Sequence, residues 1–481
     1  MSLAKPNIIY VLADDMGYGD ISRLNEQSKI RTTHLDRMAE AGMAFTDAHS
    51  SSAVCTPSRY SILTGRYNWR SGLKEGVLWG YSPSLIEQDR MTVASMLKQE
   101  GYHTACIGKW HLGMNWFKTG PLPEEVDYTK PILDGPLEYG FDYYYGVSAS
   151  LDMPPYVYIE NDRATQTPDH ITGNGDNMEY WLEGPAAPDF KHHEVFPRLT
   201  QKVLEKIDAY AADPFFIYFP MTAPHTPILP SPEFAGKSGT NAYGDFVLMC
   251  DNAVGQIIRK LEERQIADNT IVIFTSDNGC SPRANYAELA SLGHNPSYTF
   301  RGHKADIYEG GHRIPLLIKW PNKIQAGTVS DEPVCLSDLM ATVAEILMIS
   351  LPDDAGEDSV SNLPVWLGLN YAKPLREAIV HHSIDGSFSI RQGDWKLELC
   401  PGSGGWSEPQ PGLEPTGSPR IQLYDLSADI GETKNVYSIH PRIVTFMREL
   451  LIEYITSGRS TSGAPQQNTG DDRWAQLHWM A

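Results

Sequence analysis

The chain has 481 residues and a formal net charge of −21 at pH 7, and these numbers exclude whole classes of function. A protein that binds a nucleic-acid backbone needs a basic surface, so the acidic excess argues against nucleic acid as a partner. No apolar run reaches the roughly eighteen residues of a membrane span, so we predict none. An anionic ligand would need a few placed cations within an acidic protein.

The length predicts two domains, one of them large. Across residues 1–375, buried strands alternate with helices, which is typical of an α/β fold with a large, mostly parallel sheet flanked by helices. From residue 376 to 481 the pattern changes to short strand-like pieces between Gly, Pro and Asp turns, followed by a helix over 441–455. We therefore expect a smaller C-terminal domain of antiparallel sheet plus helix, with an extended surface tail from Ser457.

Two acidic pairs follow two buried strands. Residues 7–13 form an apolar run rich in β-branched side chains, which predicts a buried parallel strand, and Asp14 and Asp15 come directly after it. A second such run, residues 270–276, is followed by Asp277 and Asn278. One acidic pair can simply cap a helix. Two pairs at the same edge of a sheet favour a metal site, with oxygen donors that suit Ca²⁺ and, less well, Mg²⁺.

An unusual cysteine lies between these two pairs in the chain. Residues 55–59 read Cys-Thr-Pro-Ser-Arg, and residues 63–66 read Leu-Thr-Gly-Arg. Proline disfavours helical backbone in the residue before it, so we predict an extended or turn conformation at Cys55 and a helix over 58–63. A free cysteine is most often a buried structural residue. The other five cysteines are widely spaced, with no Cys-x-x-Cys pair, and we expect most to be reduced or incidentally buried.

Cationic side chains follow other predicted strands. Lys109 and His111 come after the strand 103–108 and would point the same way if the strand geometry continues. His225 comes after the strand 214–219 and is bracketed by prolines, which stiffen its loop. Lys304 lies in a glycine-containing segment whose backbone can approach a site closely. A surface lysine or a structural histidine is the ordinary alternative for each of them.

Together these motifs resemble the type I sulfatases, which are formylglycine-dependent, arylsulfatase-like enzymes of the alkaline-phosphatase superfamily. The segment 55–66 resembles the signature of that family, and residues 108–113 (Gly-Lys-Trp-His-Leu-Gly) match a second family segment. The resemblance covers the whole large domain, and residues 423–426 (Leu-Tyr-Asp-Leu) resemble the C-terminal segment of the family. It implies an alkaline-phosphatase-like fold and hydrolysis of sulfate esters.

The resemblance also implies a nucleophile and a metal. A separate maturation enzyme would oxidise Cys55 to formylglycine, and a hydroxyl of the hydrated aldehyde would attack sulfur while bound to calcium. Arg59 and Lys109 would hold and polarise this group. The implied metal ligands are Asp14, Asp15, Asp277 and Asn278.

The remaining cations receive implied roles in binding and proton transfer. Lys109, His225 and Lys304 would bind the sulfate oxygens and balance their charge. His225, assisted by Lys304, would protonate the departing oxygen, and His111 would take the proton of the second hydroxyl to expel sulfate.

A sulfated carbohydrate is the expected substrate. Residues 293–298 resemble bacterial sulfatases that act on sulfated galactose or N-acetylgalactosamine, so we favour the 6-O- or 4-O-sulfated forms of these sugars. The loop-rich insertion 114–190 is of the kind that often lines a substrate site. Our candidate sugar contacts are Asp152, His294 and Arg301.

Two alternatives to a sulfatase stay open. One is a phosphonate or phosphate ester hydrolase of the same superfamily, because formylglycine also serves some phosphonate monoester hydrolases. The other is a non-catalytic glycan-binding relative. Members of the family are often exported, so we expect a periplasmic or secreted protein whose leader is absent from this chain, with a cytoplasmic location not excluded.

Overall fold

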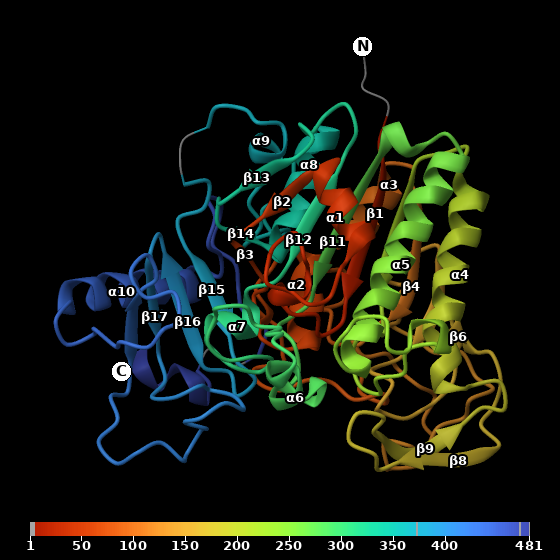
Figure 1. Ribbon diagram of the computed structural model, residues 1–481, viewed down its shortest axis with the longest axis horizontal. Coiled ribbons are helices and arrows are strands. Elements are labelled where there is room, and N and C mark those ends of the chain that lie inside the picture. The colour runs from red at the N-terminus through yellow and green to blue at the C-terminus, as the bar shows by residue number, and fades with distance from the viewer. Residues whose placement is uncertain (1–4, 372–373, 471–472, 481) are drawn as a thin grey trace.

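The fold is built on a ten-stranded sheet in the order β13-β2-β12-β11-β1-β10-β4-β5-β6-β7 (Figure 1). A computed structural model describes residues 5–371, 374–470 and 473–480. Five neighbouring strands run parallel: β11 (Thr270–Ser276), β1 (Asn7–Ala13), β10 (Phe215–Pro220), β4 (His103–Lys109) and β5 (Tyr143–Val147). Every residue of β1 and β11 is buried, as their continuous apolar sequences predict.

Further strands extend the sheet at both edges through antiparallel pairs, except that the edge strand β13 pairs parallel with β2. On one side lie β12 (Leu316–Lys319), β2 (Met43–Phe45) and β13 (Thr328–Ser330), and on the other lie β6 (Ile159–Glu160) and β7 (Arg163–Ala164). Two smaller pairs are β3 (Ala48–His49) with β14 (Val334–Cys335) and β8 (His170–Asn174) with β9 (Trp181–Ala186). The large sheet is therefore mixed but mostly parallel, as expected.

Helices cover the sheet in two groups. One group consists of α1 (Thr33–Glu40), α4 (His192–Tyr210) and α5 (Ala242–Glu263), which pack side by side (Figure 1). The other group consists of α2 (Cys55–Thr64), α3 (Val93–Gln99) and α8 (Leu339–Leu347), which contact one another. Short helices α6 (Tyr286–Ser291), α7 (Glu309–His312) and α9 (Leu363–Trp366) lie in the connections.

The C-terminal part is an antiparallel sheet with one long helix. Its strands are β15 (Ile379–His382), β16 (Phe388–Gln392), β17 (Trp395–Glu398) and β18 (Gln422–Asp425), and its helix is α10 (Pro441–Ser457). A second hydrophobic core lies here, and Tyr67 and Trp69 from the segment after α2 are part of it. The division at residue 375 stays our proposal, and this core crosses it.

Helix α2 differs from its prediction, because it begins at Cys55 and not at Ser58. Pro57 occupies the first turn, where the missing N–H would have had no partner in the helix, so proline costs little there. Val54 takes the extended conformation that precedes the helix (φ −143°, ψ 158°), and Gly65 ends it with φ 65°. Cys55 is therefore presented from the first turn of a buried helix.

Helix α4 begins at His192, although Pro197 lies inside it, because the buried Val195 and Phe196 pack on the core and stabilise the early turns. One other expectation is corrected. The tail after α10 does not run only over the surface, since Leu477 and Trp479 are buried in the second core.

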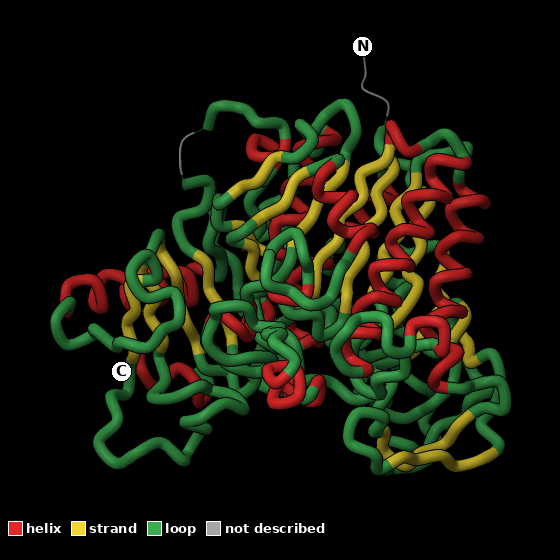
Figure 2. The backbone as a smooth tube through the Cα atoms, in the orientation of Figure 1, coloured by secondary structure: helices red, strands yellow, loops and turns green. Residues whose placement is uncertain are grey.

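Loops gather at one edge of the large sheet (Figure 2). The chain enters β1 from the opposite edge, so this loop-rich edge carries the carboxyl ends of the parallel strands (Figure 1). Ligand sites of α/β sheets lie at such an edge. Among the described residues, no helix combines the length and apolar character needed to cross a bilayer.

Candidate active site

The two acidic pairs meet because their strands are neighbours in the sheet. Strands β1 and β11 pair with Ala13 opposite Ser276, so Asp14 and Asp277 leave the sheet at the same level. The Asp15 amide donates to Asp277 Oδ1 at 3.2 Å. Asn278 Nδ2 donates to Asp15 Oδ1 at 2.7 Å. The four predicted metal ligands thus lie together at the carboxyl end of the sheet.

The donor set fits a divalent cation. Asn278 Oδ1 is buried and has no hydrogen-bond partner, which is costly for an amide oxygen unless a cation satisfies it. Ligand atoms of Asp14, Asp15 and His225 lie within 4.8 Å of one another and of Cys55 Sγ. Carboxylate and amide oxygens are the ligands that Ca²⁺ and Mg²⁺ prefer. These residues could therefore hold such an ion.

Three cationic side chains pair with the three carboxylates. Lys109 Nζ donates to Asp14 Oδ2 at 2.8 Å, and Lys304 Nζ donates to Asp15 Oδ2 at 2.7 Å. Arg59 Nη2 donates to Asp277 Oδ2 at 2.6 Å, and its Nη1 donates to the Lys109 carbonyl at 2.9 Å. Arg59 thereby ties helix α2, which carries Cys55, to the ends of β4 and β11.

The pKa values of Asp14 and Asp277 shift in opposite directions, although both carboxyl groups lie beside cations. Burial would raise the pKa of Asp14, but Lys109, His225 and Arg59 hold it well below its usual range. Burial and the adjacent Asp14 raise the pKa of Asp277 to about 6, although Arg59 acts in the opposite direction. A divalent cation among these oxygens would favour the ionised form of both groups.

Cys55 lies at the bottom of the site and is only 2% exposed. Burial raises the pKa of its thiol, although the charges of Lys109 and Lys304 oppose the shift. A thiol with a raised pKa is almost fully protonated at neutral pH, and the neutral form is a poor nucleophile. An unmodified Cys55 is therefore badly suited to attack a substrate.

His111 is held as a neutral base. Its backbone has φ 55°, a left-handed conformation that is uncommon for a residue with a side chain. Nε2 lies 2.8 Å from the Leu78 carbonyl, which can only accept, so Nε2 carries the proton. Nδ1 is buried without a partner. Burial lowers the pKa of His111 far below its usual range, and Lys109 and Arg59 act in the same direction.

His225 is oriented by its own loop. Nδ1 lies 2.6 Å from the Thr226 carbonyl and must donate to it, so Nε2 is left for the site. Nε2 lies 3.5 Å from Asp15 Oδ2. The peptide bonds before Pro224 and Pro227 are both cis. The loop therefore aims one ring nitrogen at the metal-ligand cluster.

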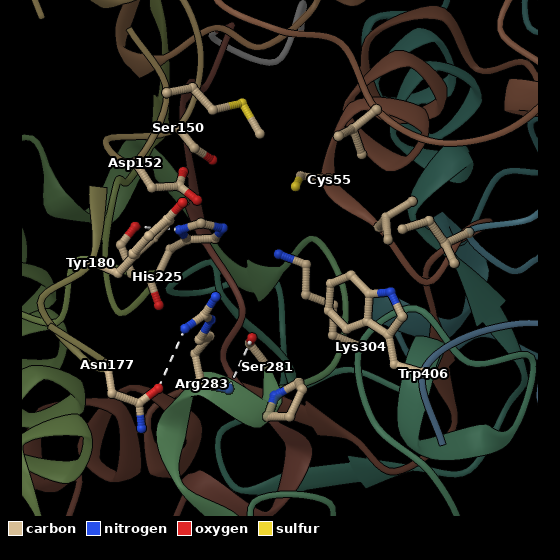
Figure 3. A pocket seen from close by; sticks show the side chains of 16 residues that line it. Cys55, Ser150, Asp152, Asn177, Tyr180, His225, Ser281, Arg283, Lys304 and Trp406 are labelled. Carbon is tan, nitrogen blue, oxygen red and sulfur yellow. Dashed lines mark hydrogen bonds between the residues drawn. The ribbon is translucent and has the colours of Figure 1, made fainter. Parts of the chain in front are cut away.

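Three of these side chains, Cys55, His225 and Lys304, line a pocket of about 580 Å³. Figure 3 shows the tips of Cys55, His225 and Lys304 pointing into a common space, with Asp152 on the side of His225. Asp152 Oδ1 is buried without a partner. Of the three predicted sugar contacts, Asp152 is the one that lines this pocket in the described chain.

The other two predicted contacts lie elsewhere. His294 is 2% exposed, and its Nε2 is 2.8 Å from Asp20 Oδ1. Arg301 donates to the Glu432 carbonyl at 2.7 Å and lies over the ring of Tyr308 at 3.8 Å. Both side chains have structural partners, and neither is among the described residues that line the Cys55 pocket. We do not carry them forward as substrate contacts.

Sequence reasoning missed most of the outer wall of the pocket. This wall includes Asn177 and Tyr180 between β8 and β9, Arg283 of a 3₁₀ turn, and Trp406 of the C-terminal part (Figure 3). Arg283 donates to Asn177 Oδ1 at 3.3 Å and lies 4.9 Å from the ring centroid of Tyr180. The sequence indicated this wall only through the loop-rich composition of the insertion 114–190, and that composition does not show which residues line the pocket.

The comparison with known families decides the identity of this fold and site. The model of the Sulfatase family matches residues 6–349. The chain belongs to the sulfatase family. An N-acetylgalactosamine-6-O-sulfatase of Bacteroides thetaiotaomicron is 35% identical to this sulfatase, over 93% of the chain and 92% of that protein. Human N-acetylgalactosamine-6-sulfatase is 30% identical, over 85% of the chain and 74% of its own length.

Solved structures agree with this assignment. A sulfatase structure from work on glycosaminoglycan metabolism by Bacteroides thetaiotaomicron has a TM-score of 0.82 and 34% identity, covering 94% of this chain and 99% of that one. A phosphonate monoester hydrolase of Agrobacterium radiobacter shares the fold with a TM-score of 0.60 at 17% identity, over 93% of this chain and 95% of that one. This sulfatase is a hydrolase of sulfate esters with the alkaline-phosphatase-like fold expected from its sequence.

Proposed function

We propose that this sulfatase removes sulfate from 6-O- or 4-O-sulfated galactose or N-acetylgalactosamine, with 6-O-sulfated N-acetylgalactosamine as the first candidate. The observation that carries the proposal is the convergence of Cys55, His225 and Lys304 on one pocket beside an oxygen-rich cation site. The choice of sugar is supported by two relatives that are named for N-acetylgalactosamine-6-sulfate.

We further propose that a maturation enzyme converts Cys55 to formylglycine and that Ca²⁺, rather than Mg²⁺, is the metal. Asp14, Asp15, Asp277 and Asn278 would hold the ion. When present, the two groups would supply a Lewis acid for the sulfate oxygens and a hydroxyl nucleophile. The high pKa of the unmodified Cys55 thiol supports this conversion, because the thiol itself would react poorly.

The protein's own side chains would bind the ester and balance its charge. Lys304 has its ammonium group at the pocket, and burial opposes that charge, but Asp15 and Cys55 raise the pKa of Lys304, so it stays a cation. Lys109 and Arg59 keep Asp14 and Asp277 neutralised beneath the nucleophile. With three carboxylates matched by three cations, a bound divalent ion would leave the site net positive and therefore receptive to a sulfate ester.

Two histidines would move protons in opposite directions. His225 presents Nε2 to the pocket and, when protonated there, would donate to the departing sugar oxygen. His111 keeps Nδ1 free and unprotonated, so it would accept a proton from the group at position 55 when sulfate leaves. Such acid–base steps each contribute about a hundred- to ten-thousand-fold in rate.

A substrate panel tests the proposal. The enzyme, co-expressed with a formylglycine-generating enzyme, is assayed for sulfate release from galactose and N-acetylgalactosamine sulfated at O6 or O4, and from 6-O-sulfated glucosamine and 2-O-sulfated iduronate. We expect the galacto-configured sugars to be hydrolysed fastest. Activity confined to glucosamine or iduronate sulfates would contradict the substrate proposal.

The phosphonate alternative needs its own comparison, because a phosphonate monoester hydrolase shares the fold. A sulfate ester and a phosphonate monoester with the same phenolic leaving group separate the two chemistries. We expect the higher kcat/KM for the sulfate ester. A periplasmic or secreted location is likewise proposed, and fractionation of the native host tests it.

A further inference from the structure

Asp15, one of the four residues proposed to hold the metal, has an unusual backbone conformation. Its φ is 65°, in the left-handed region that residues with a side chain rarely adopt. Such a conformation persists only where the surrounding structure holds it, and it is common at functional sites. The contacts that hold the Asp15 backbone therefore decide where its carboxylate lies.

The amide side of Asp15 is held by β11. Its own amide donates to Asp277 Oδ1 at 3.2 Å, and the Met16 amide donates to Ser276 Oγ at 2.9 Å. The Asp15 carbonyl has a different partner, because the hydroxyl of Tyr243 donates to it at 3.2 Å. Tyr243 lies in the first turn of α5, far from β11 in the chain.

The Tyr243 hydroxyl links Asp15 to a second acidic residue, Asp20. The hydroxyl also donates to Asp20 Oδ2, at 2.5 Å. Tyr243 is buried, and burial together with the adjacent Asp20 raises its pKa well above the usual range, so the hydroxyl keeps its proton. The two acceptors share this proton, with the shorter contact to Asp20. A fully buried carboxylate therefore fixes the group that holds the Asp15 carbonyl.

Asp20 is itself held by donors from two further segments. The Gly17 amide donates to Oδ2 at 2.8 Å, and His294 Nε2 lies 2.8 Å from Oδ1. His294 Nδ1 accepts from the Lys29 amide at 3.4 Å, so Nε2 carries the proton and donates. With the Tyr243 hydroxyl, three donors satisfy the buried carboxylate, which fixes its orientation.

Close backbone packing leaves little room for the loop 14–20 to move. An added Cβ would lie 2.3 Å from the Pro296 carbonyl oxygen at Gly17, and 2.2 Å from the Asn295 carbonyl oxygen at Gly19. The Gly19 amide donates to the Pro296 carbonyl at 2.7 Å. The segment that carries His294 is therefore seated directly on the loop that carries Asp15.

We propose that Asp20, Tyr243 and His294 form a positioning unit that holds the Asp15 carboxylate in place for the cation. This inference rests on the proposed function, because it takes Asp15 as a ligand of bound Ca²⁺. The three residues act through the loop 14–20 by keeping Asp15 in its left-handed conformation, and not by touching the ion. The unit also gives His294 a role in the reaction other than sugar contact.

Calcium affinity tests the inference. The probe is Ca²⁺ alone, titrated by calorimetry into full-length protein from which a chelator has removed metal. Tyr243→Phe removes the hydroxyl and keeps the ring, so the Kd should rise about tenfold while one ion per chain still binds. Tyr102→Phe is the matched control. It removes a buried hydroxyl that donates to the Pro6 carbonyl at 2.9 Å, before the other end of β1, and should leave the Kd unchanged.

A second variant keeps the test sharp if Tyr243→Phe does not fold. Asp20→Asn has the same shape but one acceptor oxygen in place of two, so its amide group meets a donor and the Kd should rise about ten- to a hundred-fold. In both variants the Ca²⁺ concentration for half-maximal sulfate release should rise, and kcat at saturating Ca²⁺ should return close to the wild-type value. A merely structural role would lower the thermal midpoint without changing the Kd.

The outcomes separate this inference from the proposed function. An unchanged Kd in both variants, with a wild type that binds Ca²⁺, would overturn the positioning unit alone, and so would an equal rise in Tyr102→Phe. A wild type that binds no Ca²⁺ would reject the proposed metal and the positioning unit together. If the variants weaken Ca²⁺ binding but no galacto-configured sulfate is hydrolysed, the positioning unit stands and the substrate proposal fails.

Discussion

Two clusters of buried charge can be compared in this molecule. One is the active-site cluster described above. The other, which we call the domain-interface cluster, is built around His49, His312 and His381, whose ring nitrogens also lie within 4.8 Å of one another. It joins α7 to the C-terminal sheet, because Lys396 of β17 contacts His312 of α7. By ligand spacing alone, both clusters could hold a metal.

Hydrogen bonds in the domain-interface cluster run in one direction. Lys396 Nζ, which can only donate, lies 3.0 Å from His312 Nε2. Nδ1 of His312 and Nδ1 of His49 are 3.1 Å apart, and His49 Nε2 lies 2.7 Å from Asp47 Oδ1, which accepts. With the protons on His312 Nδ1 and His49 Nε2, each of these three contacts has a donor and an acceptor, and Arg391 Nη1, which also lies 3.0 Å from His49 Nε2, donates to Asp47 Oδ1.

The active-site cluster differs in facing a pocket, which His225 and Lys304 line. Polar atoms without a hydrogen-bond partner occur in both clusters: Asn278 Oδ1 and His111 Nδ1 in the active site, and His381 Nε2 in the other cluster. His49, His312 and His381 are fully buried, and the first two are bonded into a chain of protein groups. The density of buried charge therefore does not identify an active site. Polar atoms without a hydrogen-bond partner identify one when charged side chains beside them also line a pocket.

The largest effect is expected at Cys55, the nucleophile position of the proposed function. Cys55→Ala should lower kcat/KM for a sulfate ester by about ten-thousand-fold or more, because the reacting group is removed. Thermal unfolding should change little, and mass spectrometry of the peptide around residue 55 reports whether the wild type carries formylglycine. Cys400→Ala, which removes a buried cysteine of the C-terminal part, is the control and should keep its activity. Full activity in Cys55→Ala would favour a different site.

A pair of histidine variants separates the two clusters. His111→Ala should lower kcat by about a hundred- to ten-thousand-fold, because it removes the base. His312→Ala should instead lower the free energy of unfolding by about 1–3 kcal/mol, since it removes one of the buried partners of Lys396 and the partner of His49 Nδ1. Sulfate-release assays and urea unfolding of both proteins measure these effects. A large loss of kcat in folded His312→Ala would break the distinction between the clusters.

Calcium should stabilise the active-site cluster and not the domain-interface cluster, because it would bind Asn278 Oδ1 and the neighbouring carboxylates. At a hundred times the wild-type Kd, Ca²⁺ should raise the free energy of unfolding by about 2.7 kcal/mol. At the same ion concentration the gain should be smaller in Asn278→Ala and smaller with Mg²⁺, and thermal unfolding with each ion measures both differences. Asn362→Ala, which removes a buried asparagine that bonds Asp338, should keep the full calcium response. An equal shift in Asn278→Ala would show that the ion binds elsewhere.

Acid should weaken the domain interface. Burial lowers the pKa of His49, His312 and His381, and lowers that of His382 to about 3. In the unfolded chain these groups titrate near pH 6.5, so below that pH the unfolded state binds more protons and stability falls. Each group costs up to about 1.4 kcal/mol per pH unit.

Urea unfolding between pH 7 and pH 5.5 measures this effect, and a His382→Gln variant separates it from buried carboxyl groups with raised pKa values, such as Asp277 at about 6. The midpoint should fall with pH, and His382→Gln should make the fall shallower. A midpoint that does not change across this range would contradict the assignment of neutral buried histidines.

The sequence allowed the strand ends to be predicted but not the pocket walls. Strands β1 and β11 are continuous apolar runs, so the positions of Asp14 and Asp277 follow from local pattern. Trp406 reaches the pocket because its amide donates to Asp306 Oδ1 at 2.8 Å, across 100 residues of chain. Contacts over such separations have no local signature.

The same limit applies to His294. We assigned it to the sugar from its neighbours in sequence, and its partner Asp20 lies 274 residues away in the chain, where no local pattern points to it. The start of α2 was missed for a different reason, since the proline rule is an average that holds less strongly in the first turn of a helix. Local rules are therefore weakest where a functional helix begins.

The turn after α2 is hydrogen-bonded to residues near the C-terminus, which the ribosome synthesises much later. Arg66 and Arg70 bond to the backbone or side chains of Gln467, Asn468 and Thr469, with Arg66 and Gln467 separated by 401 positions. At about 5–20 residues per second, a ribosome needs on the order of 20–80 s to make the intervening chain. Throughout that interval the helix that carries Cys55 lacks part of its final covering. The maturation enzyme that we propose for Cys55 would therefore have a period of translation in which to reach a side chain that the finished protein leaves 2% exposed.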